Sequence, residues 1–419
     1  MKFSKLSQLF LVSMIGLALA SLLTACEIVT IDYVFVASSS GSGSGSAGQI
    51  QTFDADSQTG ALRIGHAAVP SGGSDPVSMA VTADYANLYV ANAGNNSVVH
   101  FALDGNGILT QKDTVTVNTP GAVVSLAVNA AMNHLYVVST GTESGTAFAS
   151  GLLTEYSLSG GTIGSVEAVT PMTLPGYVMD FLVPTGVTVL ANNNAVYVTA
   201  YDQSAYNPGC VPTPTTSCAA STANPGWIFG YSVGSGGALT PIAGSPWKAG
   251  IKPVALTADP TSRFLYATDF ASNQLIGYTI QSGGVLDFLI NGPFKTGNEP
   301  SAIAIDPRGK YIYVSNALDS TVTGYTIDLG TGTPSGVVSL TSSAATATDT
   351  EPVAIVVDPA LGRFVYTANH LGDSVSGFEL NTDTGAISPT QATPYPAGAS
   401  PTALASVPHG NHALQVTTP

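Results

Sequence analysis

Charged side chains are scarce in this chain of 419 residues. They make up 9% of the sequence, against about 25% in average soluble proteins. Lysine and arginine together number only 11 and are scattered along the chain, whereas binding a nucleic-acid backbone needs them clustered. The shortage of basic residues therefore argues against nucleic acid as a partner. With 45 glycines and abundant Ser, Thr and Val, the composition is typical of a β-rich protein.

Cysteine is also rare, with three residues in the whole chain. Cys210 and Cys218 are separated by seven residues within a stretch rich in Pro and Thr. In an oxidising compartment the simplest outcome for such a pair is one disulfide. A metal site is the alternative, but the sequence offers no second Cys pair and no nearby His. We therefore expect a disulfide, no metal and no cofactor.

The third cysteine, Cys26, closes an N-terminal segment that has the layout of a signal peptide. Lys2 and Lys5 precede an apolar stretch that is too short to be a typical membrane span. The ending Leu23-Thr24-Ala25-Cys26 resembles a bacterial lipobox. This resemblance implies that residues 1–25 are removed, that Cys26 carries the lipid, and that residues 26–31 form a short tether. A plain secretory signal is the alternative.

Cleavage of the signal segment would remove two of the basic residues and make the chain more acidic. Without Lys2 and Lys5, the 11 basic residues fall to 9 against 26 acidic ones, a formal charge of −17. Glu27 follows the lipobox-like cysteine, and in lipoproteins a residue other than Asp at this position favours the outer membrane. The resemblance thus implies a cell-envelope protein, lipid-anchored at the outer membrane, and we expect a monomer.

One short sequence recurs along the chain, an apolar strand that ends in Tyr-Val-Ala/Ser-Asn. Clear copies occupy residues 88–92, 312–316 and 365–369, and weaker ones begin at Val34, Leu135, Val196 and Leu265. A last trace is found at residues 413–416. The mean period is about 54 residues, close to that of propeller blades.

Each repeat contains four predicted strands, named a to d from the centre outwards. In the repeat that begins at Pro300 they cover residues 300–305, 311–316, 321–327 and 337–340, separated by turns rich in Asp, Pro and Gly. Strand a is expected again at residues 76–81, 124–128, 178–183, 253–258, 352–357 and 401–407.

The two ends of the chain complete each other. The N-terminal part has strands b, c and d without a strand a, and residues 401–407 supply a strand a without a complete blade. The sequence therefore predicts an all-β, seven-bladed β-propeller over residues 32–419, built from four-stranded antiparallel blades. Its ring is closed by N-terminal strands b, c and d together with the C-terminal strand a.

These repeats resemble the lactonase family of seven-bladed propellers, which includes a bacterial 6-phosphogluconolactonase, and also the Tyr-Val-Thr-Asn repeat propellers of cell envelopes. The resemblance spans about residues 32–407. It departs from the family at the catalytic positions, because Val178 falls near the family's strand-a histidine and Lys252-Pro253 stands where the family has Arg-His after a proline. The remaining candidate catalytic residues are Lys252, Asp269, Asp180 and His370.

The b–c and d–a loops of all blades emerge on one face of a propeller, here called the upper face. Long insertions lie there, including residues 201–226 with the two cysteines, and unequal loops on one face favour a binding surface. The candidate ligand-binding residues of this face are Asn92, Tyr201, Asp202, Trp227, Asp269, Asn316 and Asn369. For the Asn and Asp residues that follow strand b, capping of the b–c turns is the structural alternative.

Three function classes are compatible with these features. The leading hypothesis is a lipid-anchored envelope propeller that binds a carbohydrate, lactone or protein ligand without catalysis. The alternative is a sugar-lactone hydrolase, and the third is a structural surface-layer or matrix protein. Three of the four arginines, Arg263, Arg308 and Arg363, lie in turns of the opposite, lower face. That placement leaves few donors for a phosphorylated lactone, which favours binding over 6-phosphogluconolactone hydrolysis.

Overall fold

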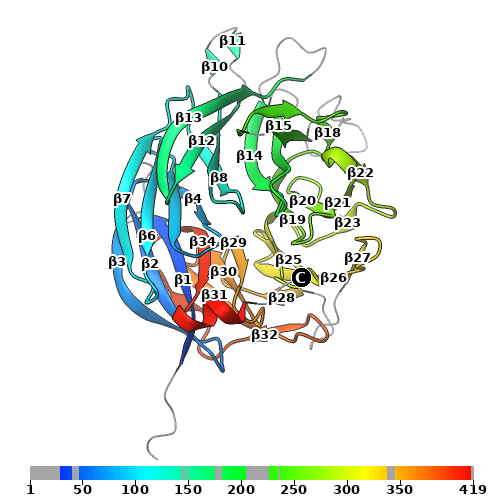
Figure 1. Cartoon of the computed structure of the whole chain (residues 1–419). Coiled ribbons are helices and arrows are strands. Elements are labelled where there is room, and N and C mark those ends of the chain that lie inside the picture. The colour runs from blue at the N-terminus through cyan, green and yellow to red at the C-terminus, as the bar shows by residue number, and fades with distance from the viewer. Residues whose placement is uncertain are drawn as a thin grey trace, which may run out of the picture.

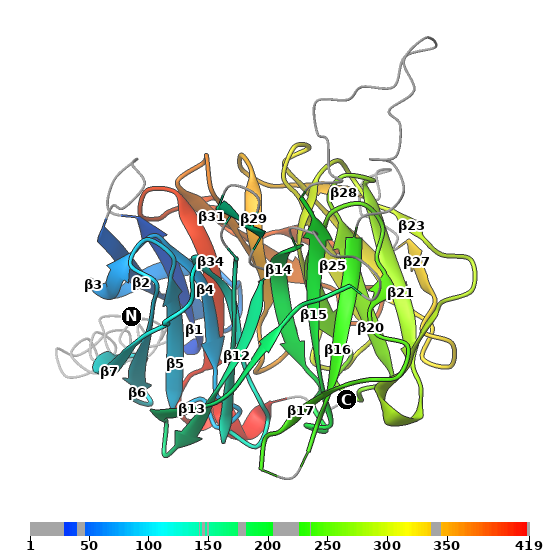
Figure 2. The same ribbon diagram turned by 90° about the horizontal axis from the view of Figure 1, so that it is seen from above.

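The structure of the protein is a computed structural model that describes residues 29–39, 47–141, 143–144, 147–148, 151–174, 182–203, 226–234, 236–336 and 345–416. Seven antiparallel sheets stand side by side around a central axis (Figures 1 and 2). The predicted seven-bladed propeller is thereby confirmed. Cys26, Cys210, Cys218, Asp180 and Val178 lie outside the described residues. Within them, no helix is long and apolar enough to cross a membrane.

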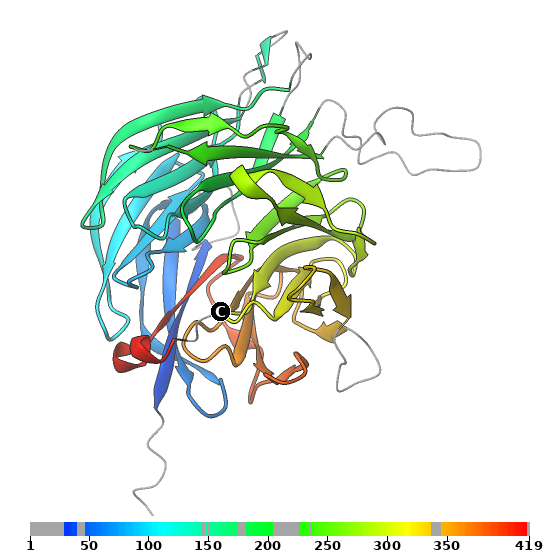
Figure 3. The ribbon, with the colours of Figure 1, turned by 45° about the vertical axis from the view of Figure 1, so that its right-hand side comes forward.

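Blade 1 joins the two ends of the chain in one sheet. It contains β1 (Thr30–Ser39), β2 (Ala47–Asp56), β3 (Leu62–Ser74) and β34 (Pro401–Pro408), in the order β3-β2-β1-β34. β1 pairs antiparallel with β34, from Asp32 opposite Pro408 to Ser38 opposite Pro401. The C-terminal 3-10 turn η2 (Gly410–Gln415) lies beside β1 (Figure 3). The predicted closure of the ring is confirmed.

The other six blades follow the chain in order, each beginning with its innermost strand. Blade 2 consists of β4 (Pro76–Val81), β5 (Asn87–Asn92), β6 (Ser97–Leu103) and β7 (Leu109–Thr116). Blade 3 consists of β8 (Val123–Val128), β9 (His134–Ser139), β12 (Leu152–Ser159) and β13 (Thr162–Pro171), with the small hairpin β10 (Glu143–Ser144) and β11 (Ala147–Phe148) in its b–c loop. Blade 4 consists of β14 (Leu182–Val189), β15 (Ala195–Asp202), β16 (Gly226–Val233), β17 (Leu239–Pro241) and β18 (Trp247–Lys248).

The last three blades have the same plan, with an outer edge divided into two short strands. Blade 5 consists of β19 (Pro253–Ala258), β20 (Phe264–Asp269), β21 (Gln274–Ile280), β22 (Leu286–Phe288) and β23 (Phe294–Lys295). Blade 6 consists of β24 (Pro300–Ile305), β25 (Tyr311–Asn316), β26 (Thr321–Ile327), β27 (Pro334–Gly336) and β28 (Ala345–Ala347). Blade 7 consists of β29 (Pro352–Val357), β30 (Phe364–Asn369), β31 (Ser374–Leu380), β32 (Ile387–Pro389) and β33 (Tyr395–Pro396).

Three sequence predictions of strand position need correction or fall outside the described part. Strand a of blade 4 is β14, residues 182–189, and not residues 178–183. Pro184 resembles a strand breaker in the sequence, but it sits at a register shift of the β14–β15 pair, where a proline is tolerated. The trace at residues 413–416 is no strand, because η2 occupies most of it. The outer strand predicted at residues 337–340 lies outside the described residues.

A tyrosine at the third position of strand b connects one blade to the next. Its side chain is completely buried, and a buried hydroxyl needs a partner. In five blades it donates to the carbonyl of a glycine in the c–d turn of the following blade. The five pairs are Tyr89 with Gly161, Tyr197 with Gly284, Tyr266 with Gly332, Tyr313 with Gly385, and Tyr366 with Gly60, at 2.5–2.9 Å.

These glycines adopt a conformation that other residues avoid. All five have φ between +65° and +85°, the left-handed region that glycine enters without steric cost. The two remaining blades depart from the pattern. Blade 1 has Phe35 at the position of the tyrosine, and the hydroxyl of Tyr136 in blade 3 faces Glu155 of its own blade and has no partner in the next blade among the described residues.

Blade 1 also buries a carboxyl group against blade 7. Asp32 of β1 is fully buried, and its carboxyl group faces that of Asp358 in the blade 7 a–b turn. Burial above all, and then the charge of Asp358, raises the pKa of Asp32 well above its ordinary value. Asp358 in turn accepts the backbone N–H groups of Leu361, Arg363 and Phe364. Burial therefore favours the protonated form of Asp32.

Removing one tyrosine hydroxyl tests the connection between blades. In Tyr313→Phe the Gly385 carbonyl loses its donor inside the protein, so we expect the free energy of unfolding to fall by about 1–2 kcal/mol. Urea denaturation followed by fluorescence gives this value. Tyr136→Phe is the matched control because its hydroxyl makes no such bond to the next blade. It is measured with EDTA present, so that no bound metal ion contributes to its stability. An equal loss in both variants would contradict a specific role of the bond.

The pH dependence of stability tests the carboxyl pair. Because the folded-state pKa of Asp32 is raised, the unfolded state loses this proton first, and stability falls as the pH rises above about 4. Asp32→Asn removes the titration and keeps a donor toward Asp358. We expect the variant to be more stable than wild type by about 1 kcal/mol or more at pH 7, with the difference shrinking toward pH 4. A difference that does not depend on pH would refute the assignment.

Candidate functional site

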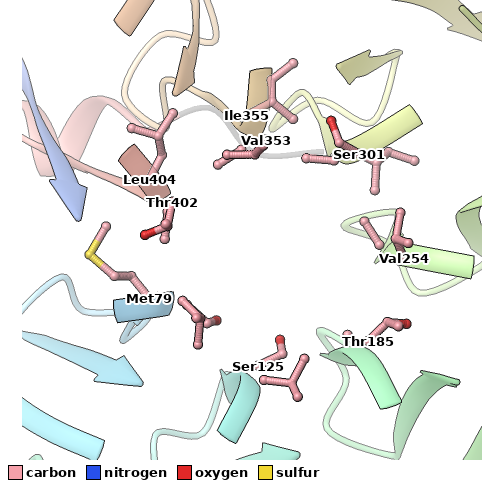
Figure 4. Close-up of a pocket in the computed structure, with 18 of the residues that line it drawn as sticks. Met79, Ser125, Thr185, Val254, Ser301, Val353, Ile355, Thr402 and Leu404 are labelled. Atoms are coloured by element: carbon pink, nitrogen blue, oxygen red, sulfur yellow. The ribbon is translucent and has the colours of Figure 1, made fainter. Parts of the chain in front are cut away.

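A channel runs along the propeller axis between the seven innermost strands. It encloses a cavity of about 270 Å³, and the side chains that surround it form a ring around an open centre (Figure 4). Most of them are small and apolar, such as Val77, Val254 and Val353, and none of the lining residues is titratable. The wall of the channel therefore offers shape and apolar contact but no acid–base group.

Three hydroxyl groups of this wall are already used by the fold. Thr185, Ser301 and Thr402 occupy the same position in three blades. Each donates to the carbonyl of the proline that begins the innermost strand of the next blade, over 2.5–2.7 Å. These bonds connect neighbouring strands around the channel. Charged groups that can act on a ligand must therefore lie at the ends of the channel.

At the upper mouth of the channel, the described blades repeat one arrangement of two residues. The residue before strand a and the residue after strand b are joined by a backbone hydrogen bond. Phe270 N–H donates to Lys252 O at 3.0 Å, and His370 N–H donates to Glu351 O at 2.8 Å. In blade 6, Ala317 N–H donates to Glu299 O in the same way at 2.8 Å. The mouth thus carries a lysine, two glutamates and a histidine.

Four residues of this mouth have an unusual backbone conformation. Asp75, Glu299, Glu351 and Ser400 each precede a proline and have φ between +48° and +58°, whereas residues before proline are usually extended. Such conformations cost about 1–3 kcal/mol and cluster at functional sites. The sequence analysis did not identify the two glutamates as mouth residues. Acid–proline pairs recur before strand a at residues 75–76, 299–300 and 351–352, and this repetition could have indicated them.

Asp269, a candidate catalytic carboxylate, instead positions Lys252. It is completely buried, and its two oxygens accept the backbone N–H groups of Ile251 at 2.8 Å and Lys252 at 2.9 Å. The amide oxygen of Asn273 binds the N–H of Glu299 in a comparable way at 2.8 Å. Asp269 and Asn273 therefore hold the backbone of two mouth residues, Lys252 and Glu299.

The other Asn candidates are also engaged in the fold. Asn316 accepts the N–H of Gly297 at 3.1 Å, and Asn92 accepts the hydroxyl of Ser71 at 2.6 Å. These two partners lie in the segment that leads into strand a of the same blade. Asn316 also donates to the hydroxyls of Thr321 and Thr323 on the far side of the b–c turn, as the capping alternative predicted. Asn369 donates to the hydroxyls of Ser374 and Ser376.

Lys252 is the cation of the upper mouth. Its Nζ lies 4.9 Å from the ring centre of Phe270 and 5.5 Å from that of Tyr201, which belongs to blade 4. Burial lowers the pKa of Lys252, while the negative charge of Glu299 acts in the opposite direction. A partly desolvated ammonium beside two rings and a carboxylate is suited to bind a carbonyl or carboxylate oxygen.

The remaining candidates have contacts of their own. His370 belongs to blade 7, two blades further round the ring, and its Nδ1 lies 3.2 Å from the carbonyl of Pro401. When Nδ1 donates to that oxygen, Nε2 is left as the proton acceptor. Trp227 contacts Lys248, whose Nζ lies 3.6 Å from its ring centre, and Asp202 ends β15. Asp180 lies outside the described residues.

The arginines are at the lower face, as the turn pattern predicted. Arg263 donates to the carbonyl of Leu329 at 2.8 Å, and Arg308 donates to the carbonyl of Gly362 at 2.6 Å. Both bonds reach lower turns of the following blade. Lys252 is therefore not accompanied by these arginines at the upper mouth.

Comparison with known proteins supports the predicted resemblance. Residues 243–415 match the family described as Lactonase, 7-bladed beta-propeller. This stretch includes blades 5 to 7 and the closing strand β34, with Lys252, Glu299, Glu351 and His370. A search of curated proteins finds no match.

Solved structures share the fold over most of the chain. The periplasmic gluconolactonase of Pseudomonas aeruginosa is 17% identical with a TM-score of 0.68, covering 90% of this chain and 99% of its own. Putative 6-phosphogluconolactonases of Bacteroides fragilis and Bacteroides uniformis are 18% and 17% identical, with TM-scores of 0.66 and 0.67. Each covers 90% of this chain, and 98% and 99% of its own length. At these identities the similarity establishes the lactonase-type propeller fold alone.

Proposed function

We propose that the protein is a sugar-lactone hydrolase that takes an unphosphorylated lactone at the upper mouth of the channel. The observation that carries the proposal is Lys252, held by Asp269 beside Tyr201, Phe270 and Glu299. This cluster lies largely in the segment that matches the lactonase family. The solved gluconolactonase and the putative 6-phosphogluconolactonases, which share the fold, point to the same class of substrate.

Charge decides between the two kinds of lactone. A phosphorylated sugar needs several positive donors around its phosphate, and three arginines of this chain lie in lower turns. The acidic chain also repels an anion within the Debye length of about 8 Å. A neutral sugar lactone avoids both penalties, and it presents a flat, partly apolar ring to Tyr201 and Phe270.

The chemistry of hydrolysis assigns a role to each mouth residue. The ammonium of Lys252 stabilises the negative charge that develops on the lactone carbonyl oxygen. A carboxylate or imidazole accepts a proton from the attacking water and returns it to the ring oxygen as the ring C–O bond breaks, which gives the open hydroxy acid. Glu299 is placed beside Lys252 for this step, and His370 is the second base available at the mouth.

Ligand binding without turnover is the second candidate function. It is favoured by the engagement of Asp269 with backbone groups and by the absence of titratable side chains from the lining residues of the channel. A propeller of this kind binds the lactone or a related carbohydrate at the same mouth, and Lys252 contributes to affinity alone.

A hydrolysis assay with glucono-δ-lactone and 6-phosphogluconolactone distinguishes these functions. We expect turnover of the neutral lactone, reduced about 100-fold or more in Lys252→Gln and in Glu299→Gln. His370→Ala shows which of the two bases acts. Lys310→Ala, an exposed lysine of a lower turn, is the control and retains full activity.

Each other outcome of this assay has a definite meaning. Binding of the lactone without turnover, weakened in Lys252→Gln, supports the second candidate. Turnover of the phosphorylated lactone alone contradicts the choice of substrate. If neither lactone binds nor reacts, both proposals are wrong.

We also propose that Cys26 is lipid-modified and holds the protein at the outer membrane. The lipobox-like sequence supports this, because thioether lipidation with acylation provides more than the single chain that binds membranes only marginally. We expect the full-length protein to fractionate with membranes and Cys26→Ala to become soluble in the periplasm or medium. Membrane fractionation of Cys26→Ala equal to that of wild type would refute the anchor.

A further inference from the structure

A buried polar cluster lies between blades 3 and 4, toward the lower face and away from the channel mouth. It consists of His134 on β9, Glu155 on β12 and Glu167 on β13. His134 Nδ1 is 3.0 Å from Glu155 Oε1 and 3.0 Å from Glu167 Oε2. One nitrogen and two carboxylate groups thus converge from three neighbouring strands, with their ligand atoms within 4.8 Å of one another.

The strand register explains why these side chains share one face of the sheet. Glu155 is paired with Tyr136, and His134 is two residues before Tyr136, so alternation places all three on the same side. The β12–β13 pair shifts register between Glu155 and Tyr156. Glu167 is the extra residue at this bulge, and a bulge re-aims its side chain.

The position of Glu155 is glycine in the four following blades. The strand-c residue opposite the strand-b tyrosine is Gly230, Gly277, Gly324 or Gly377 in blades 4 to 7. Blade 4 then closes over the cluster with a glycine of its own. A Cβ added to Gly237 would lie 2.6 Å from Glu155 Oε1 and 2.9 Å from Glu167 Oε2.

The polar atoms of the cluster are not satisfied by the protein. The side chain of Glu155 has no exposed surface, and 11% of the His134 side chain is exposed. Neither oxygen of Glu155 nor Nδ1 of His134 has a conventional hydrogen bond among the described residues. Buried carboxylates of this kind are costly unless a cation lies between them.

Blade 2 provides an internal comparison at the equivalent positions. His100 Nδ1 lies 2.6 Å from Asp113 Oδ1, and His100 Nε2 lies 2.8 Å from Asn87 Oδ1. The second oxygen of Asp113 accepts the N–H of Ile163 at 2.9 Å, and Tyr89 keeps its bond to Gly161. This network is complete without an ion, in contrast to that of blade 3.

We propose that His134, Glu155 and Glu167 bind one zinc ion, which connects three strands of blade 3 where the tyrosine–glycine bond to blade 4 is missing. Imidazole nitrogen and carboxylate oxygen are zinc ligands with bond lengths of about 2.0–2.2 Å, which places ligand atoms of a tetrahedral site about 3.4 Å apart. The 3.0 Å separations need only a small opening to reach this value. Water or the Tyr136 hydroxyl supplies the fourth ligand, and the partly exposed Glu167 gives access from solvent.

Metal titration of the full exported protein tests the site. After treatment with EDTA, isothermal titration with zinc chloride is expected to give one ion per chain, with a rise of the melting temperature. Glu155→Gln and Glu167→Gln should each lower the affinity about 100-fold or more. Glu167 is partly exposed, so its variant keeps the test valid if Glu155→Gln does not fold. Cobalt substitution gives an absorption spectrum that reports the nitrogen and oxygen ligands.

Two controls separate this site from other sources of binding. His100→Gln in blade 2 and the pair Cys210→Ser and Cys218→Ser should leave the zinc affinity unchanged. If the cysteine variant loses the ion and Glu167→Gln keeps it, the metal binds elsewhere and the proposal is wrong. If wild type binds no zinc, the proposal is equally refuted.

Discussion

The architecture depends on a hydrogen bond that crosses the interface between blades. The strand-b tyrosine in this interface is completely buried, so its hydroxyl needs an acceptor inside the protein. The acceptor is a glycine carbonyl in the c–d turn of the next blade, as between Tyr313 and Gly385. A direct bond of this kind fixes both the spacing and the angle of neighbouring blades, and repetition of that angle closes the ring and determines the width of the channel.

The same requirement for satisfied polar groups determines where chemistry can occur. Hydroxyls of the channel wall are engaged with proline carbonyls of the next blade, and Asp269 is engaged with the backbone before strand a. The titratable groups that remain available for a ligand therefore lie at the upper mouth. Lys252 and Glu299 lie there because Asp269 and Asn273 hold their backbone, and not because the strands themselves carry a catalytic motif.

The blade 3 cluster is an exception, because it buries polar groups that lack full hydrogen-bond partners. Where five blades bury a satisfied tyrosine, blade 3 buries a histidine and a glutamate that only partly neutralise each other. Zinc would connect three strands of blade 3 at the interface that lacks the tyrosine–glycine bond. The channel mouth and this cluster are on different faces, so a ligand and a metal ion can be bound independently.

Sequence reasoning was most successful where the signal was local. The Tyr-Val-X-Asn strands, the Asp-Pro turns and the incomplete ends each depend on a few adjacent residues, and they were sufficient for the blades and the closure. Blade 4 was misplaced because Pro184 interrupts its innermost strand in the sequence, while a register shift accommodates it in the sheet. The mouth glutamates were overlooked because nothing in one repeat shows that an acid before a proline faces a lysine of the preceding blade.

By itself, the sequence determined the fold class, the number of blades, the pairing of the two ends and the face on which the long loops emerge. Alternation of side chains and turn chemistry are properties of short segments, and they do not depend on contacts with other blades. Only the tertiary structure decided which polar side chains meet across blades. Tyr313 and Gly385 are 72 residues apart, and Lys252 meets Tyr201 from another blade. Such contacts depend on the angle between sheets and on single bulges, which no local pattern records.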